Sequence, residues 1–173
     1  MGTGSPLFCQ PRAMRIPACL GIAFALSACA AYDGYSLRAG ASTESEVRGV
    51  MGAPALEFTG EDGSRHLVYP RGPLGTQTFM ASVGRDGVLR EVRPVLKDDN
   101  FNRIRPGLTQ QEILQMIGPP GDTMHFARSD TTAWDYRYID TWGYLAIFSV
   151  TFDNKGVVLS KITRRIERES SSR

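Results

Sequence analysis

One short pattern occurs twice in this chain, and this internal repeat constrains the fold more than any other feature. Each copy has a loop glycine, then a threonine with a glutamate three residues later, an apolar stripe, and a Gly-x-Pro stop. The matched positions are Gly40, Thr43, Glu46, Gly52 and Pro54 in the first copy and Gly107, Thr109, Glu112, Gly118 and Pro120 in the second. The copies differ by one residue between the glycine and the threonine. We therefore expect two versions of one folding unit.

Each copy predicts a short helix with defined ends. A threonine followed three residues later by glutamate has the spacing of a capping box. The apolar residues behind it fall at positions i, i+3 and i+4, which places them on one helix face. They are Val47, Val50 and Met51 in the first copy, and Ile113, Met116 and Ile117 in the second. Gly52 and Gly118, each followed by proline two residues later, predict where the helices end.

The residues after each helix alternate as β-strands do. Apolar positions alternate with polar or small ones, and glycine-rich turns separate the runs. These positions are Leu56, Phe58, Leu67, Tyr69, Phe79, Ala81 and Val83 in the first copy and Met124, Phe126, Trp134, Tyr136, Tyr138, Phe148, Val150 and Phe152 in the second, with closing strands at 88–95 and 157–163. The fold class is predicted to be α+β, with two tandem units of short helices on an antiparallel meander of about four strands. Units of this size have marginal cores, so we expect them to pack on each other.

The start of the chain has the pattern of a lipoprotein signal. Arg12 and Arg15 precede an apolar run at 16–26, and a small-residue site follows, ending in Ala28 and Cys29. The run is shorter than the roughly 20 residues that a spanning helix needs. We expect cleavage between Ala28 and Cys29 and acylation of the Cys29 sulfur.

The expected mature chain starts at Cys29 whether translation begins at Met1 or at Met14. Of the 20 basic residues only two precede the cleavage site, so the mature chain has equal numbers of basic and acidic residues. Because it lacks a basic field, nucleic acid is not an expected partner. Two or more acyl chains would hold the protein at a bilayer. Ala30 in second place resembles the enterobacterial signal that permits transfer to the outer membrane.

These patterns divide the chain into five segments. We predict a signal peptide at 1–28, a lipidated linker at 29–36, a first unit at 37–96, a second unit at 97–163, and a disordered charged tail at 164–173. The second unit begins at a polar junction formed by residues 97–100.

The order of elements in each copy resembles the SmpA/OmlA family of outer-membrane lipoproteins, the BamE-like proteins. In the second copy the matching residues are Ile104, Gly107, Thr109, Ile113, Gly118, Pro120, Trp134, Tyr136, Val150, Phe152, Gly156 and Val157. The first copy matches less well, with Leu67 in place of an aromatic residue and Gly84 in place of an acidic one. The family has a single unit, so this chain would be a tandem-repeat member.

The resemblance implies a non-enzymatic scaffold on the periplasmic face of the outer membrane, which binds other envelope proteins and takes part in β-barrel protein assembly. Tandem units of this kind also resemble the β-lactamase inhibitor protein, in which two copies form one continuous concave sheet. The alternative function is therefore an inhibitor of a periplasmic or host enzyme such as a β-lactamase or lysozyme. Such an inhibitor would project a loop side chain, for which Trp142 and Phe101 are the candidates.

No catalytic, metal-binding or cofactor-binding pattern is found in the sequence. His66 and His125 each lie on a predicted strand without a ligand partner at metal-binding spacing, which places them on polar strand faces. The serines lack a nucleophile elbow, and no glycine-rich phosphate loop occurs. A hydrolase remains an alternative only if folding gathers a histidine with distant carboxylates.

A partner surface is predicted on the last sheet. If Phe148, Val150 and Phe152 face the core, then Leu145 and Ile147 point outward, because neighbouring strand residues face opposite sides. These two residues would lie beside Trp142, and exposed apolar side chains grouped on a sheet often mark a partner site. The alternative is that the first unit, or the segment 32–38, covers this face.

Overall fold

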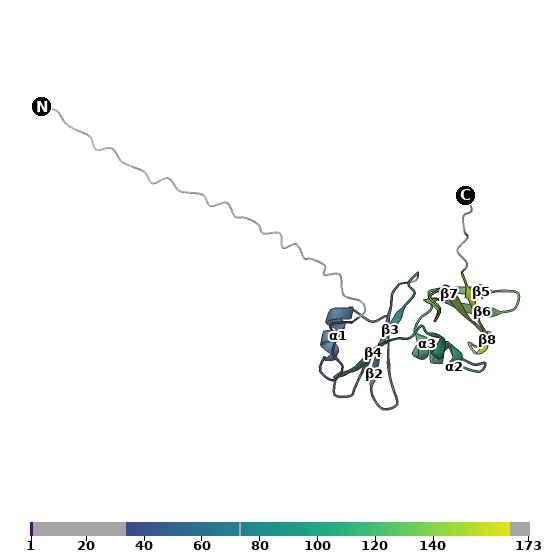
Figure 1. Ribbon diagram of the computed structural model, residues 1–173, viewed down its shortest axis with the longest axis horizontal. Coiled ribbons are helices and arrows are strands. Elements are labelled where there is room, and N and C mark those ends of the chain that lie inside the picture. The colour runs from purple at the N-terminus through teal and green to yellow at the C-terminus, as the bar shows by residue number, and fades with distance from the viewer. Residues whose placement is uncertain (2–33, 73, 167–173) are drawn as a thin grey trace.

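The computed structural model describes Met1 and residues 34–72 and 74–166 (Figure 1). The predicted signal peptide beyond Met1, the predicted acylation site Cys29 and residues 167–173 lie outside the described residues. The remainder forms two units, each with its own antiparallel four-stranded sheet.

The first unit is one helix on a four-stranded meander. Its elements are α1 (Glu44–Met51), β1 (Leu56–Thr59), β2 (Arg65–Pro70), β3 (Thr78–Val83) and β4 (Leu89–Pro94). The strands pair in sequence order to form what we call the first sheet. The apolar stripe of α1 packs on one face of this sheet, where Leu67, Tyr69 and Ala81 are buried.

The second unit repeats this plan with one additional helix. Its elements are α2 (Asp98–Arg103), α3 (Gln110–Ile117), β5 (Asp122–Phe126), β6 (Thr131–Ile139), β7 (Leu145–Phe152) and β8 (Val158–Arg165). Strands β5 to β8 also pair in sequence order and form the second sheet. The predicted α+β class and the tandem meanders are confirmed.

One predicted boundary is wrong. At the polar junction 97–100 the chain enters α2, which begins at Asp98 and buries Phe101 in the second core. The predicted tail from residue 164 starts too early. Strand β8 runs to Arg165, and the Ile166 N–H donates to the Leu145 carbonyl at 2.8 Å. The charge of these residues predicted a frayed end, but pairing with β7 orders them.

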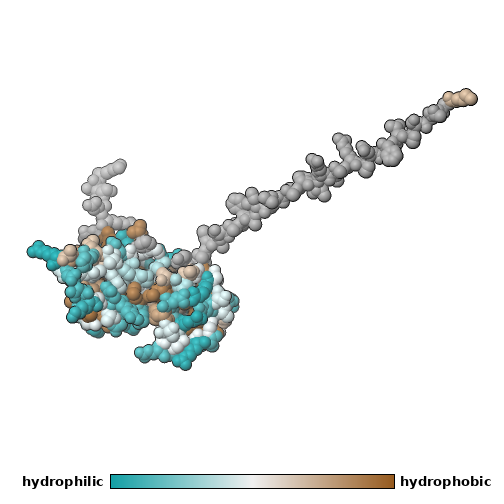
Figure 2. Space-filling view, turned by 180° about the vertical axis from the view of Figure 1, so that it is seen from behind, coloured by the Kyte–Doolittle hydropathy of each residue, from teal (hydrophilic) through white to brown (hydrophobic). Residues whose placement is uncertain are grey.

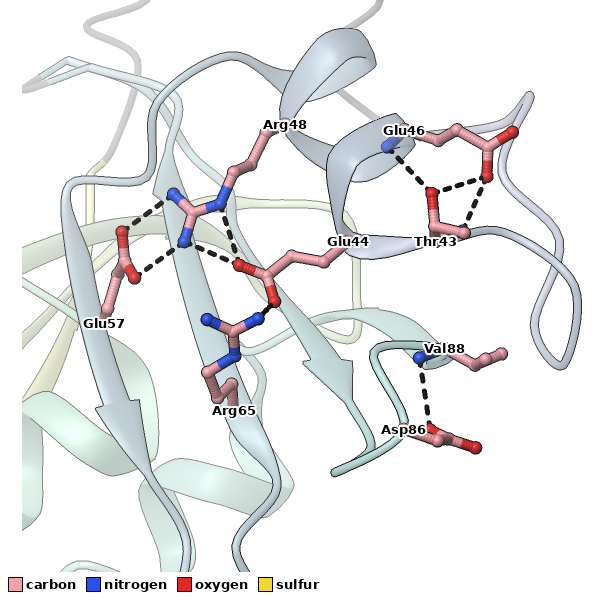
Figure 3. Close-up of polar contacts among 8 residues, drawn as sticks. All are labelled: Thr43, Glu44, Glu46, Arg48, Glu57, Arg65, Asp86 and Val88. Atoms are coloured by element: carbon pink, nitrogen blue, oxygen red, sulfur yellow. Dashed lines mark hydrogen bonds and ion pairs between the residues drawn. The ribbon is translucent and has the colours of Figure 1, made fainter.

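Both helices begin with a complete capping box, as the repeat predicted. The Glu46 N–H donates to the Thr43 hydroxyl at 3.3 Å, and the Thr43 N–H donates back to the Glu46 carboxylate at 2.6 Å (Figure 3). Thr109 and Glu112 make the same two bonds, at 3.3 and 2.7 Å. Each threonine also forms an isolated bridge to the start of the last strand, Thr43 to Val88 and Thr109 to Val157.

Replacing Thr109 by alanine is expected to lower the free energy of unfolding by about 1 kcal/mol, the usual effect of losing an N-cap side chain. The substitution removes the acceptor for the Glu112 N–H and leaves that helix end without its cap. Urea unfolding of the variant checks the prediction. Thr123→Ala is the control, because Thr123 lies exposed on β5. Equal unfolding midpoints for the two variants would contradict the prediction.

Charged side chains fasten α1 to its sheet beside the apolar stripe, where Glu44 is itself buried. Arg48 bridges Glu44 at 2.9 Å and Glu57 on β1 at 2.7 Å, and Glu44 also pairs with Arg65 on β2 (Figure 3). In the second unit Gln110 replaces Glu44 as the first helical residue. This ion-pair network therefore belongs to the first unit only.

The two units pack against each other through the far side of the first sheet. Val68, Met80 and Val95 form a separate buried cluster on the face opposite α1. Gly118, at the end of α3, lies so close to this face that a side-chain carbon there would be 2.8 Å from Val68 Cγ1. The layers are thus α1, the first sheet, α3 and the second sheet. Figure 2 shows hydrophobic residues in the middle of the molecule, where both units meet.

The two sheets are not joined by strand pairing within the described residues. The continuous concave sheet implied by the resemblance to the inhibitor is therefore not formed. Helix α3 separates the two sheets.

Candidate functional site

Strand β7 divides the second sheet into a core face and an outer face. Its residues alternate strictly, with Ala146, Phe148, Val150 and Phe152 buried and the residues between them partly exposed. Leu145 and Ile147 are among the partly exposed residues. The two side chains therefore lie on the side of the sheet opposite α2 and α3, in the orientation that the sequence predicted.

The strand register places further side chains on this outer face. Ile139 is paired with Leu145, Ile147 lies between Arg137 and Arg164, and Ser149 lies between Asp135 and Ile162. Met124 and Phe126 lie on the same face of β5, because they pair with Ala133 and Thr131. The apolar side chains that protrude most are Ile162 at 65%, Met124 at 54%, Ile139 at 49% and Phe126 at 44% exposed. Figure 2 shows hydrophobic surface beside the grey C-terminal trace, on the second unit.

A tight hairpin between β6 and β7 holds two aromatic side chains at the edge of this face. The turn closes through the Gly143 N–H, which donates to the Asp140 carbonyl at 2.9 Å, and Gly143 has a φ of +82°. Glycine adopts this left-handed conformation without steric cost. Trp142 is 78% exposed and Tyr144 is 58% exposed. Together with the outer face, residues 139–147 form what we call the Trp142 surface.

The Asp140 carboxylate bonds to the backbone of the hairpin and to the end of β8. One carboxylate oxygen accepts from the N–H groups of Trp142 and Tyr144 at 2.9 and 2.8 Å. The other accepts from Arg165 Nε at 2.6 Å, and the same guanidinium lies 4.8 Å from the centre of the Tyr144 ring. These bonds link the loop to the end of β8.

Asp98 on α2 also bonds to the β6–β7 hairpin. Its carboxylate accepts from the Tyr138 hydroxyl at 2.8 Å and from the Thr141 N–H at 3.2 Å. The hydrogen bonds from Thr141 are the main cause that lowers the pKa of Asp98. The loop backbone is thus bonded to α2 and to β8, and it holds Trp142 at the surface. A loop that is already held in place loses little conformational entropy on binding.

Asp140 is expected to make the stability of the hairpin depend on pH. Burial raises the pKa of its carboxyl, but the hydrogen bonds from Tyr144, Arg165 and Trp142 together hold the pKa below the ordinary value of 3.8. A lowered pKa stabilises the folded state above the ordinary value, and this contribution is lost as the pH falls through the folded pKa. The Asp140→Asn variant should therefore unfold more easily than wild type at pH 7, and the difference should shrink at pH 3.

Urea midpoints at the two pH values measure this difference. Asp99→Asn is the matched control, because Asp99 is an exposed carboxylate on α2. A difference between Asp140→Asn and wild type that stays constant from pH 7 to pH 3 would contradict the assigned role of the carboxylate.

The described residues do not cover the Trp142 surface. Leu37 packs against the core of the first unit, and a side chain at Gly34 would meet Leu37, Met51 and Val92. The described part of the segment 32–38 therefore lies on the first unit. The first unit itself contacts the second near the end of α3. Neither the first unit nor the described residues 34–38 occupy this face.

One candidate residue of the inhibitor alternative is excluded. Phe101 is 3% exposed and stacks on Phe148, with ring centroids 4.1 Å apart, so it cannot enter the active site of another protein. Trp142 remains available for such a role. The structure also adds residues that sequence reasoning missed, namely Ile162 and Arg164 on the outer face of β8 and the pair Asp140 and Arg165, which holds the loop.

The two histidines lie apart on different sheets. His66 is half-buried on β2, stacks on Phe58 at 4.8 Å and contacts the Ser82 hydroxyl at 3.1 Å. His125 is exposed on β5, 3.3 Å from the Thr132 hydroxyl and 3.9 Å from Asp130. Over the described ranges, histidine, cysteine and acidic side chains form no group of three suited to a metal ion. No helix in this part of the chain has the length and apolar character to cross a bilayer.

These observations define an α+β protein made of two related units, one of which carries an exposed aromatic and aliphatic surface. No protein-family model matches the chain, and no curated protein matches it.

Three solved structures are similar to parts of the chain. A putative osmotically inducible lipoprotein, OsmE, is 24% identical over 39% of this chain and 70% of its own, with a TM-score of 0.34. A putative β-lactamase inhibitor protein from Streptococcus mutans is 13% identical over 71% and 82%, with a TM-score of 0.33. A DUF4309 family protein (YjgB) from Bacillus subtilis is 16% identical over 76% and 84%, with a TM-score of 0.30.

Proposed function

We propose that this protein is a lipid-anchored, non-enzymatic binding protein of the bacterial envelope, and that the Trp142 surface contacts its protein partner. The observation that supports this most is the rigid exposure of Trp142 next to Tyr144 and the apolar outer face. Tryptophan, tyrosine and arginine dominate the energetic centres of protein interfaces. The Arg165 guanidinium lies 4.8 Å from the centre of the Tyr144 ring, so all three residue types occur at this hairpin.

The lipid anchor would act by tethering. Acylation at Cys29, with Ala30 in second place, would hold the protein at the periplasmic face of the outer membrane. Confinement near a membrane raises the effective concentration toward partners in the same layer, so that a modest interface is sufficient. In this proposal the partner is another envelope protein, and the β-barrel assembly machinery is the first candidate.

The anchor is tested by fractionation of cells that make the full-length chain. Wild type should be found with the membranes and carry acyl groups on Cys29 by mass spectrometry, while Cys29→Ser should lose both properties. An unacylated wild-type protein would contradict the anchor.

The surface is tested by photo-crosslinking in cells, with the probe at Trp142 or Ile147. Both positions should give a product with the same envelope protein, and a probe at Ser45, exposed on α1, should not. Trp142→Ala should lower the yield from position 147 by at least about tenfold, as expected for an energetic centre. Equal products from all three positions, or none, would contradict the surface.

The second candidate function is enzyme inhibition, which the fixed Trp142 loop favours. A rigid, protruding side chain is the form in which an inhibitor enters an active site. Purified protein should then inhibit a β-lactamase or a lysozyme, and Trp142→Ala should abolish the inhibition. No inhibition of either enzyme at micromolar protein would remove this candidate.

A further inference from the structure

Strand β8 is the last strand of the second sheet, and part of its backbone has no partner on the outer edge. The loop residues 107–108 cover its start, through two backbone hydrogen bonds to Val158 at 3.0 and 2.7 Å. Further along, the Ile166 N–H donates to the Leu145 carbonyl of β7. Backbone groups of an antiparallel strand alternate in direction, so residues 161, 163 and 165 turn theirs away from β7. In the part of the chain that the structure describes, no other segment bonds to the backbone of these three residues.

The first unit closes the corresponding edge with a proline. Pro94 pairs with Phe79 in the first sheet, as Thr163 pairs with Phe148 in the second, and the two phenylalanines correspond in the repeat. The next residue, Val95, donates its N–H to β3, so the backbone of Pro94 faces outward. Proline has no N–H, and proline on an edge strand prevents further pairing. Thr163 retains its N–H, so the edge of β8 is open where its counterpart is closed.

A small pocket lies beside this open edge, between β8 and α2. It is about 140 Å³ in volume, and its lining includes Asp98 and Asn102 of α2 and Lys161 and Thr163 of β8. A strand added along β8 would place every second side chain on the helix side of the sheet, next to this pocket. In complexes formed by strand addition the backbone hydrogen bonds give affinity, and pockets for alternate side chains give specificity.

The pocket contains a positive charge that no carboxylate of the described residues pairs with. Lys161 Nζ donates to two backbone carbonyls of α2, at 2.7 and 3.2 Å, which leaves one of its three N–H groups free. Burial, and then the positive charge of Arg105, lower the pKa of Lys161. Asp98 also lines the pocket, but its carboxylate accepts from Tyr138 and Thr141. An acidic side chain entering this pocket would therefore meet an ammonium group without a counter-charge.

The other side chains of β8 indicate which strand fits the edge. Arg164 and Ile162 are exposed on the outer face, between and beside the residues of the open edge. Opposite charges on paired strands stabilise a sheet, and like charges destabilise it. A second copy of β8, paired about a two-fold axis at Thr163, would place Arg165 opposite Lys161. The charges therefore disfavour self-pairing and favour an acidic strand.

We propose that the edge of β8 binds an extended segment of another protein as an added antiparallel strand. The segment has acidic residues opposite Lys161 and Arg164 and an apolar residue opposite Ile162. This surface is additional to the Trp142 surface, and binding there requires neither acylation nor Trp142.

The first test measures the binding of a fluorescent peptide to the full-length chain in detergent, by anisotropy. The probe contains Thr-Glu-Val-Ile-Glu, whose glutamates lie opposite Arg164 and Lys161 and whose valine lies opposite Thr163. N-methylation of this valine removes the N–H that would donate to the Thr163 carbonyl, and should weaken binding at least about tenfold. A peptide with glutamine in place of both glutamates should also bind more weakly. Equal binding of the methylated and unmethylated peptides, or no binding of either, would overturn the proposal.

The second test changes the edge itself. Thr163→Pro should weaken binding at least about tenfold, because it closes the edge as Pro94 does. Thr163→Val is the matched control, which retains the N–H and should bind as wild type does. Circular dichroism checks that both variants are folded, and the methylated peptide provides the same comparison with the unchanged protein. Equal binding by the two variants, both folded, would overturn the proposal.

Lys161→Met tests the charge. It should weaken binding of the glutamate peptide and leave binding of the glutamine peptide unchanged, whereas a merely structural role of Lys161 would weaken both equally. Sedimentation tests the other occupant, because a wild-type dimer that Thr163→Pro converts to a monomer would assign the edge to a second copy of the chain. Either of these last two outcomes would overturn the proposal. The peptide assay is separate from crosslinking at Trp142, so this proposal and the proposed function can fail independently.

Discussion

Replacing Phe101 by alanine is expected to destabilise the second unit by about 3–5 kcal/mol, the range for removing a buried aromatic side chain. Phe101 is 3% exposed, stacks on Phe148 and meets the edge of Tyr138 at 4.7 Å. Helix α2 has only six residues, and its N-cap residue Lys97 makes no side-chain capping bond. So short a helix is unstable without tertiary packing. Loss of the ring should therefore release α2 as well as leave a cavity.

Urea unfolding followed by the signal of the second unit measures this effect. Phe126→Ala is the control, because Phe126 is also a phenylalanine of the second unit but is 44% exposed. The free energy of unfolding of Phe101→Leu should lie between those of the control and of Phe101→Ala, because leucine retains much of the buried volume. A change below about 1 kcal/mol, the range of surface substitutions, would show that α2 does not depend on this contact.

The helices that the sequence predicted share one property, which is that their ends are encoded locally. A threonine and a glutamate form each capping box, and a glycine closes each helix. These bonds involve residues at most four apart, so a single stretch of sequence contains the whole signal. The strand alternation behaves similarly, because a buried face imposes a period of two. The orientation of Leu145 and Ile147 was predictable for this reason.

Helix α2 was missed because its stability comes from contacts distant in sequence. Asp98 and Asn100 are weak helix formers, and six residues contain no apolar stripe. The ring of Phe101 and the bonds from Asp98 to Tyr138 and Thr141 hold the segment, and these partners lie about forty residues away. Only folding brings them together.

The end of β8 was missed for a related reason. Arg164 and Arg165 carry charge, which favours solvent, yet both pair with β7 and Arg165 also pairs with Asp140. The candidate surface was therefore predicted without its basic edge. The docking of the two units was not predictable either, because the glycine that permits it is also the glycine that ends α3.

Gly118→Ala is expected to lower the free energy of unfolding by about 1–3 kcal/mol more than Gly52→Ala does. This is the range for forcing extra volume into a packed site. The two glycines have the same role in the repeat and nearly the same backbone, with φ of +84° at Gly52 and +82° at Gly118. Alanine is strained at both positions in this conformation. At Gly52 nothing lies within 4 Å of the added carbon, whereas at Gly118 it would meet Val68 Cγ1 at 2.8 Å and Thr78 Cγ2 at 3.0 Å.

The comparison of these two variants isolates the contact between the units, because the backbone strain is common to both. Their unfolding midpoints in urea should differ, with Gly118→Ala the less stable. Val68→Ala should relieve part of the additional cost when combined with Gly118→Ala, although Val68→Ala alone destabilises by emptying a buried site. Two outcomes would show that α3 does not pack against the first sheet. One is equal urea midpoints for the two glycine variants. The other is that Val68→Ala destabilises the Gly118→Ala variant as much as it destabilises wild type. In that case the two units would move independently, and the layer order would not be maintained.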